Sequence, residues 1–302
     1  MISKEKVLKN LRMSQALLGV SHQEFKTLCV PFGLAYLSLK EEIKHNFTKG
    51  RKSILQDIEE NLFFILFYLK TYPTYDVLGA VFKMDRTTAC KLVKLLAEVL
   101  FLSLGSMNTL PANEVSDLKK KLKKLKKLKY VIIDGTERPI RRPTGKDLQK
   151  EFYSGKKKRH TIKNLILTNK DKAILFLSNT ISGKTHDLKV AENTMITSAI
   201  PKDVVCILDS GFEGIEKTSK KVNIIKPKKK PKKRELTATQ KAKNTRISKK
   251  RIFVENAFAG IKRFRITSDV IRCFRKDFKH LVFVLAAGLW NLHLFFNKRF
   301  NY

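Results

Sequence analysis

The chain has 302 residues, of which 43% are hydrophobic, enough to bury the core of one large domain or of two smaller ones. This composition excludes a disordered chain. Lys and Arg number 63 against 27 Asp and Glu, and the formal net charge of +36 would repel itself strongly unless a polyanion neutralised part of it. The partner expected from this charge is a nucleic acid, and charge alone leaves an RNA-binding or ribosome-associated protein open.

The cysteines and the apolar segments indicate a cytosolic protein. The four cysteines are scattered and form no C-x-x-C pair, which is typical of reduced, buried thiols. No apolar stretch that could serve as a secretory signal follows Met1. The most apolar segment, Leu281 to Phe296, is short for a membrane span and contains Asn291 and His293, so we expect a core helix and no membrane partner.

The first unit, residues 1–110, has helical periodicity. Apolar residues between Ile54 and Leu69 repeat at helical spacing, a short helix is expected over about 74–82, and Asp85 is a good N-cap for a third helix. Two short helices joined by a tight turn are typical of a helix-turn-helix that enters the major groove of DNA. An ordinary helical hairpin with a solvated basic face is the alternative. The expected DNA contacts on the outer face of the third helix are Arg86, Thr87, Thr88, Lys91 and Lys94.

A basic linker is expected over 111–129. Its segment KKKLKKLKKLK places leucines three residues apart among lysines, which indicates a helical or frayed connector that could lie along DNA phosphates. A helix on a membrane surface is the alternative, but three leucines offer little apolar area. The later segment Lys226–Arg234, KPKKKPKKR, is too charged and too rich in proline for a core, and we expect a basic loop there.

Three acidic residues stand out against this basic background. Asp134 closes the apolar run from Tyr130 to Ile133 and precedes Gly135, which permits a sharp exit from a strand. Asp209 closes a second such run, Val204–Leu208, before Ser210 and Gly211. An aspartate before glycine is often only a turn former.

The third acidic residue, Glu255, lies in a helical pattern, in a helix expected to begin near Arg246. Three carboxylates are enough for two Mg²⁺ ions, which prefer oxygen ligands and keep several waters. Asp187 is a competing acidic ligand because it also follows a turn, but we interpret it as the cap of the next helix. No Cys/His spacing predicts zinc.

The elements expected over 130–302 follow the order of the RNase H-like fold. Three strands, a helix from about His186 to Ser198, a fourth strand, a short helix, a fifth strand and a long helix form an α/β domain with a mixed five-stranded sheet flanked by helices. The first and fourth strands are neighbours in that order, which would place Asp134 beside Asp209, and the long helix would bring Glu255 to the same edge.

Six stretches carry a resemblance to a known family. In chain order they are IDGTERPIRRP, FYSGKKKRHTIKNLIL, SGKTHDLKV, LDSGFEGI, NTRISKKRIFVENAFAGIKRF and AAGLWNLHL. With them the chain resembles the DDE-type transposases of bacterial insertion sequences that carry an N-terminal helix-turn-helix, an insertion-sequence-five-like group related to the Harbinger transposases. The resemblance covers nearly the whole chain.

The resemblance assigns roles to particular residues. It implies that Asp134, Asp209 and Glu255 are the catalytic, metal-binding triad, with two Mg²⁺ ions for which Mn²⁺ can substitute. It also implies a phosphate-contacting Arg and Lys on the triad helix, matched here by Arg251 and Lys262, whereas Ser248 stands where that group has a Tyr. Further DNA contacts are expected at Lys156, Lys157 and Arg159 of the GKKKRH stretch.

These implications describe a complete enzyme. The helical domain would recognise terminal inverted repeats of double-stranded DNA, and the RNase H-like domain would cleave the element ends and transfer them to target DNA. Pairing of two ends predicts a homodimer, and the location expected is the bacterial cytoplasm, at the nucleoid. An inactive or domesticated transposase that only binds DNA is the alternative.

Overall fold

The computed structural model describes residues 3–44, 54–55, 57–125, 128–231, 234–273 and 275–297. Its contacts divide the chain into two units, a helical one and an α/β one. The helical unit comprises Met1–Leu110, Ile261–Asp269 and Asp277–Asn297, and the α/β unit is formed mainly by Pro111–Gly260 with Val270–Lys276. The units therefore differ from the simple division expected at residues 110 and 130, because two C-terminal segments group with the N-terminal helices.

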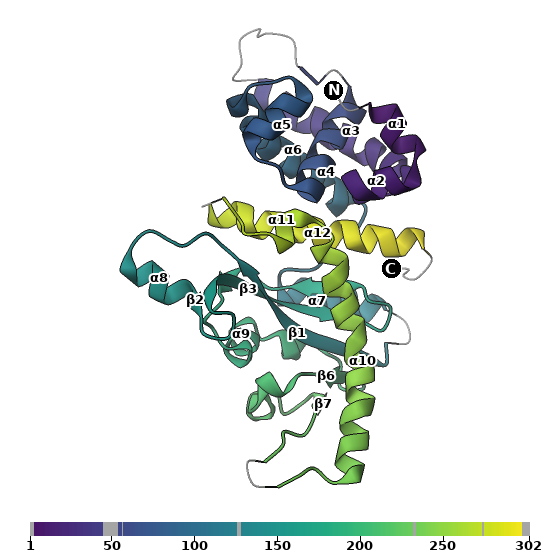
Figure 1. Ribbon diagram of the computed structural model, residues 1–302. Coiled ribbons are helices and arrows are strands. Elements are labelled where there is room, and N and C mark those ends of the chain that lie inside the picture. The colour runs from purple at the N-terminus through teal and green to yellow at the C-terminus, as the bar shows by residue number, and fades with distance from the viewer. Residues whose placement is uncertain are drawn as a thin grey trace. The chain divides into compact units, whose positions relative to one another are not determined.

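The helical unit is built from helices alone in the part of the chain that the structure describes (Figure 1). They are α1 (Lys4–Lys9), α2 (Leu11–Leu17), α3 (His22–Lys44), α4 (Ile58–Thr71), α5 (Tyr75–Phe82), α6 (Arg86–Ser106), α11 (Arg265–Ser268) and most of α12 (Lys276–Phe296). A capping box begins α3, since the Ser21 N–H donates to Glu24 Oε2 at 2.6 Å and the Glu24 N–H donates to Ser21 Oγ at 3.2 Å.

The pair α5 and α6 has the local chemistry of a helix-turn-helix. Thr74 caps α5, and Asp85 caps α6 by accepting from the Thr88 N–H at 2.9 Å. Lys83 takes the left-handed conformation between the two helices, with a φ of 56°. Gly79 allows the turn to fold back, because a Cβ there would lie 2.4 Å from the Met84 carbonyl oxygen. The expected elements of this motif are confirmed.

The apolar segment near the C-terminus belongs to the core of the helical unit. Helix α12 is long and apolar enough to cross a membrane by length and composition, but 67% of its most apolar window is buried inside the structure. The Asn291 side chain donates to the Thr109 carbonyl at 2.8 Å, and His293 lies 2.7 Å from the Glu24 carboxylate. The expectation of a core helix agrees with this burial.

The α/β unit is built around a sheet with strand order β2-β3-β1-β6-β7, to which β4 and β5 add by pairing with β3. The strands are β1 (Tyr130–Pro139), β2 (Tyr153–Ser154), β3 (Arg159–Thr168), β4 (Ile174–Leu177), β5 (Ile181–Ser182), β6 (Val205–Ile207) and β7 (Asn223–Ile225). Strand β1 pairs antiparallel with β3 and parallel with β6, which confirms that the first and fourth expected strands are neighbours. The mixed sheet and its flanking helices have the RNase H-like arrangement.

The helices of the α/β unit are α7 (Val115–Lys124), α8 (Lys146–Phe152), α9 (Asp187–Thr194) and the long α10 (Ala238–Lys262). The last residues of α10 count with the helical unit. Short 3₁₀ turns lie at Ile196–Ala199, Ser210–Phe212 and Ile215–Lys217. Figure 1 shows α10 running beside β1, β6 and β7. It begins eight residues before the expected start near Arg246. The prediction placed the start too late because the first turns of the helix are polar and lack apolar periodicity.

The expected linker is an ordered part of the α/β unit where the structure describes it. Helix α7 buries Leu118 and Leu122 and packs on β4 and on the turn Ile196–Ala199. Lys126 and Lys127 of this segment, and two residues of the basic loop Lys226–Arg234, lie outside the described residues. The described part of that loop is fixed by Asn244 of α10, which accepts from the Lys228 N–H and donates to the Lys228 carbonyl, each at 2.9 Å.

Candidate active site

Asp134 lies in the middle of a strand. Strand β1 continues through Gly135 to Pro139 along β3, so the expected sharp exit at Gly135 is wrong. What ends near Asp134 is the parallel pairing with β6, whose last partners are Ile132 and Ile207. The side chain is only 17% exposed, and burial raises its pKa above the ordinary value although the Arg251 guanidinium opposes that change.

Asp209 lies two residues beyond the end of β6 and begins the 3₁₀ turn Ser210–Phe212. Its side chain makes no capping hydrogen bond to that turn and is 37% exposed. Because β1 and β6 are parallel neighbours, both aspartates reach the same edge of the sheet. A local turn-forming role does not explain the Asp209 carboxylate.

A single guanidinium joins the two aspartates. Arg251 of α10 donates from Nη1 to Asp209 Oδ1 at 3.0 Å and from Nη2 to Asp134 Oδ2 at 3.1 Å. Its Nε is buried and has no hydrogen-bond partner among the described residues. Arg251 therefore neutralises two carboxylates that would otherwise face each other, while one of its own donors is left unsatisfied.

Glu255 follows Arg251 by four residues and so lies on the same face of α10, with an exposed side chain. Within the described residues, no group of three or more His, Cys, Asp or Glu side chains is gathered closely enough to hold a metal ion. Asp134 and Asp209 have the hard oxygen donors that Mg²⁺ prefers. Two carboxylates thus meet here with Arg251 between them, and Glu255 lies one helical turn beyond Arg251 on α10.

Asp187 is closer to this site than the sequence indicated. The N-cap of α9 is His186, which makes no side-chain hydrogen bond, so the expectation that Asp187 caps the helix is wrong. Its Oδ1 lies 2.9 Å from the Lys163 ammonium, without the angle of a hydrogen bond. Lys163 is buried between Asp187 and Glu137, at 3.7 Å from the latter, and donates to the Thr185 carbonyl at 2.7 Å. Strand β3 thereby holds the start of α9.

Glycines make room for the Asp187 carboxylate. A Cβ at Gly135 would lie 2.8 Å from Asp187 Oδ1, and one at Gly211 would lie 3.7 Å from Oδ2. In the sequence, Gly135 directly follows Asp134, and Gly211 follows Asp209 by two residues. From the sequence we considered Asp187 as a ligand but interpreted it as a helix cap, and Lys163 was not singled out. Nothing in the local spacing of SGKTHDLKV indicates that Lys163 of β3 lies beside Asp187.

The expected DNA contacts of the helical unit are on the surface. Arg86, Thr87, Lys91 and Lys94 are exposed on α6 and Thr88 is half-buried, engaged with Asp85. The apolar face of α6 is buried opposite them, with Ala89, Val93 and Leu96 inaccessible to solvent. In the α/β unit, Lys156 and Lys157 are exposed in the turn between β2 and β3, and Arg159 is exposed at the start of β3. Lys262, the last residue of α10, is exposed as well and counts with the helical unit.

Comparison with known proteins agrees with this architecture. The family model described as DDE superfamily endonuclease matches residues 133–291, and the model described as helix-turn-helix of DDE superfamily endonuclease matches residues 54–106. The chain belongs to the DDE superfamily of endonucleases, in the form that carries a helix-turn-helix. The first match contains Asp134, Asp209 and Glu255, and the second contains the cap Asp85 and the basic face of α6.

A curated relative places the chain among the transposases of insertion sequences. The chain is 30% identical over 284 residues to the probable transposase for insertion sequence element IS702 of Microchaete diplosiphon, an alignment that covers 94% of this chain and 95% of that one. No solved structure gave a significant match.

Proposed function

We propose that the chain is an active DNA transposase that recognises the terminal inverted repeats of its element, cleaves DNA at the element ends and joins the freed 3′ ends to target DNA. The observation that supports it most is the meeting of Asp134 and Asp209, 75 residues apart in the chain, at one edge of the sheet. Two carboxylates that lie close together repel each other unless a cation stands between them, and Arg251 is that cation here. We infer that metal ions would take this place when they bind.

The proposed metal ligands are Asp134, Asp209 and Glu255, for two Mg²⁺ ions or for Mn²⁺ in their place. When bound, the ions would activate the attacking oxygen and stabilise the negative charge on the non-bridging and leaving oxygens of the phosphate. Glu255 would join the site from α10, and Arg251 would leave the carboxylates. The unsatisfied Nε of Arg251 favours such a move, because the side chain gains hydrogen bonds on a phosphate that it lacks in its present position.

The remaining residues would position the DNA. Arg251 and Lys262 would hold phosphates near the reacting bond, and Lys156, Lys157 and Arg159 would bind the strand farther away. Arg86, Thr87, Thr88, Lys91 and Lys94 would read the inverted repeat in the major groove. Two chains would pair the two ends as a homodimer, in the cytoplasm at the nucleoid.

The test is cleavage of DNA from the element ends in the presence of Mg²⁺. Asp134→Asn, Asp209→Asn and Glu255→Gln should each lower the rate by a factor of about a thousand or more, while DNA binding is retained. Asp203→Asn is the matched control, because Asp203 is an exposed aspartate just before β6. Tight binding without any cleavage by the unaltered chain would overturn the proposal in favour of a DNA-binding protein that has lost its activity.

The charge of +36 also suits RNA, and a competition experiment separates the two partners. Duplex DNA with the element end and structured RNA should be compared at one fixed salt concentration, since phosphate binding of either kind weakens with salt. Preference for the element end supports the transposase, and preference for RNA would contradict it.

A further inference from the structure

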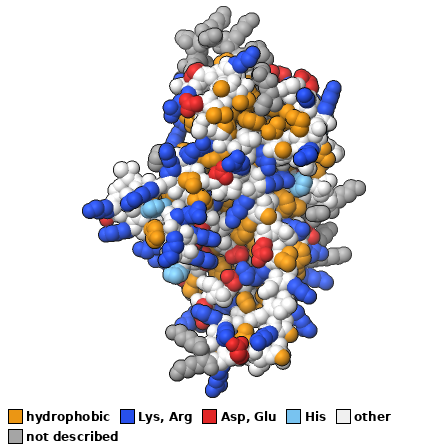
Figure 2. Space-filling model, viewed as in Figure 1, with side chains coloured by type: hydrophobic (Ala, Val, Ile, Leu, Met, Phe, Trp, Pro, Cys, Tyr) orange, Lys and Arg blue, Asp and Glu red, His pale blue; other side chains and the backbone are white. Residues whose placement is uncertain are grey.

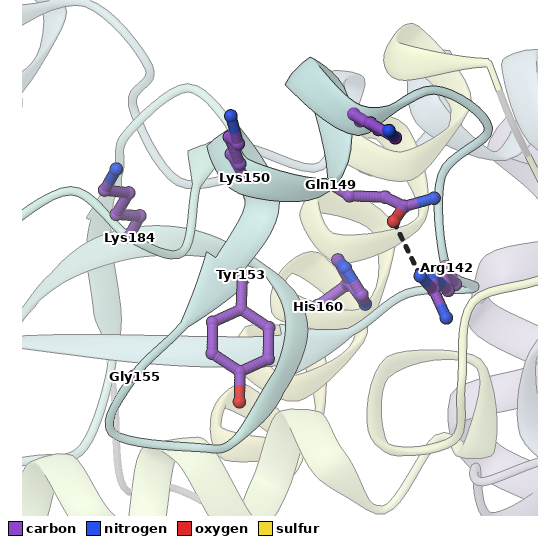
Figure 3. A pocket seen from close by; sticks show the side chains of 8 residues that line it. Arg142, Gln149, Lys150, Tyr153, Gly155, His160 and Lys184 are labelled. Atoms are coloured by element: carbon purple, nitrogen blue, oxygen red, sulfur yellow. Dashed lines mark hydrogen bonds between the residues drawn. The ribbon is translucent and has the colours of Figure 1, made fainter.

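A second basic site lies in the α/β unit, apart from the aspartates. It is a cavity of about 770 Å³ formed by α8, by strand β2, by the start of β3 and by Lys184 after β5. Figure 3 shows the side chains that line it, and Figure 2 shows Lys and Arg gathered over the projecting region around α8. The lining residues are Arg142, Lys146, Gln149, Lys150, Tyr153, Gly155, His160 and Lys184.

Hydrogen bonds and strand pairing give this cavity a fixed wall. Gln149 accepts from Arg142 Nη2 at 2.8 Å and donates to the Pro143 carbonyl at 2.9 Å, which fixes the guanidinium at one end (Figure 3). Tyr153 and His160 are opposite each other in the β2–β3 pair, and their rings meet edge to face with centroids 5.7 Å apart. The Tyr153 ring is therefore supported from one side, and it remains 42% exposed.

No Asp or Glu is among the residues that line the cavity. Across the described ranges of the chain, none of the four cations Arg142, Lys146, Lys150 and Lys184 forms an ion pair with an Asp or Glu. By contrast, Lys163 and Arg251 elsewhere in the same unit each hold two carboxylates. Four cations around a hollow with an exposed aromatic ring favour a ligand that is both anionic and planar.

We propose that this cavity holds an unpaired nucleotide of a DNA strand, with its base stacked on Tyr153 and the adjoining phosphates on Lys146, Lys150, Lys184 and Arg142. Aromatic rings beside cations are how proteins bind single strands, because every base has a face that can stack. A base inside a duplex offers no free face to Tyr153. The volume lies within the range of about 300–1,000 Å³ that is usual for small-ligand sites.

A strand suits this cavity better than a free nucleotide does. A phosphate monoester carries a charge of about −2, and four unpaired cations exceed it. A strand brings several phosphates. The exposed Lys156 and Lys157 of the adjoining β2–β3 turn, with Arg159 at the start of β3, extend the basic surface beyond the cavity. The inference depends on the proposed function only in taking DNA as the strand.

The experiment uses the full chain and a short single-stranded DNA with one 2-aminopurine. Stacking on Tyr153 should quench the fluorescence of this base, and Tyr153→Ala should abolish the quenching and weaken binding about tenfold, whereas Tyr153→Phe should preserve both. Lys150→Glu should weaken binding and lower its salt dependence, and Lys150→Arg should restore it. The matched control is Lys202→Glu, which alters an exposed lysine of the same unit that does not line the cavity.

Three further measurements distinguish a strand from a duplex or a free nucleotide, and this cavity from the cleavage site. A fully paired duplex with the same 2-aminopurine should show no quenching that depends on Tyr153, and deoxynucleoside monophosphate should not displace the strand. Displacement by the monophosphate at concentrations comparable to those of the strand would overturn the proposal, as would unchanged quenching in Tyr153→Ala. Asp134→Asn should leave the quenching intact, so loss of cleavage and loss of this site are separate results.

Discussion

The carboxylate of Asp187 lies against the backbone of Gly135, so closely that a Cβ at position 135 would stand 2.8 Å from Oδ1. The glycine therefore serves a contact between β1 and the first turn of α9, beside Asp134. It does not serve a turn, because β1 passes straight through it.

Gly135→Ala should lower the free energy of unfolding by about 1–3 kcal/mol, the usual cost of overpacking, as measured by urea unfolding with circular dichroism. Gly155→Ala is the control for the loss of a glycine, since a Cβ at Gly155 meets nothing within 4 Å. Combining Gly135→Ala with Asp187→Ala should restore part of the loss. Equal stability of Gly135→Ala and the unaltered chain would refute the close contact.

Lys163→Met should destabilise the α/β unit by about 3 kcal/mol, because it leaves the Glu137 and Asp187 carboxylates without their shared, buried cation. Lys120→Met is a matched control, since Lys120 pairs with Asp117 at the surface, where both side chains are more than half exposed. That control should change stability by less than about 1 kcal/mol. Similar losses in the two variants would contradict a structural role for the buried network.

Arg251→Ala should increase the affinity of the DNA-free protein for Mn²⁺ roughly fivefold, because a partly exposed ion pair of about 1 kcal/mol no longer competes with the metal. The measurement is calorimetric titration or the electron paramagnetic resonance signal of free Mn²⁺. Lys250→Ala, on the same helix, is the control, since Lys250 lies over the Tyr130 ring and touches neither aspartate. Weaker Mn²⁺ binding in Arg251→Ala would show that Arg251 supports the metal site in its present position.

Gly79→Ala should destabilise the helical unit by about 2 kcal/mol, even though alanine is the better helix former by about 1 kcal/mol. A Cβ at Gly79 meets a backbone carbonyl oxygen at 2.4 Å, and the turn before α6 would have to shift. Gly33→Ala, in α3, meets only a flexible Ile58 side chain at 3.5 Å and should be neutral or stabilising. Fluorescence of Trp290, the one tryptophan of the chain and part of this unit, follows the unfolding.

The stability of the helical unit should fall in acid through Glu24. Burial acts to raise the pKa of Glu24. Hydrogen bonds from His293 and the Ser21 N–H, together with the charges of His293 and Arg263, outweigh burial and lower the pKa below 4.5. A depressed carboxyl pKa gives stability that is present above the unfolded pKa of about 4.5 and is lost as the pH falls through the folded value. In Glu24→Gln and in His293→Ala, the free energy of unfolding should fall less steeply with decreasing pH, as measured by Trp290 fluorescence in urea. An equally steep fall in Glu24→Gln would contradict the role given to Glu24.

Short-range patterns predicted much of this structure. The start of α5 near residue 74 and the cap Asp85 follow from local residue types, which the chain carries within a few residues. The pairing of β1 with β6 was expected from the order of the elements. The bridging of Asp134 and Asp209 by Arg251 follows only from the packing of α10. Helix α10 also begins in a polar stretch, where apolar periodicity gives no signal for the first residue of the helix.

Contacts between segments that are distant in the chain could not be predicted from local patterns. The contact of Asp187 with Gly135 and Lys163 joins three separate segments, and no spacing within any of them indicates it. The same holds for the helical unit, which takes in Ile261–Asp269 and Asp277–Asn297 although the 150 residues of Pro111–Gly260 separate them from Leu110. The basic cavity beside α8 was missed because its four cations look like ordinary surface lysines and arginines in a chain so rich in both.

The place of α12 in the helical unit has a consequence for synthesis. The core around Glu24 and Thr109 is completed by Asn291 and His293, which leave the ribosome only after the whole α/β unit has been made. A nascent chain that stops before α12 would thus carry an incomplete DNA-reading unit.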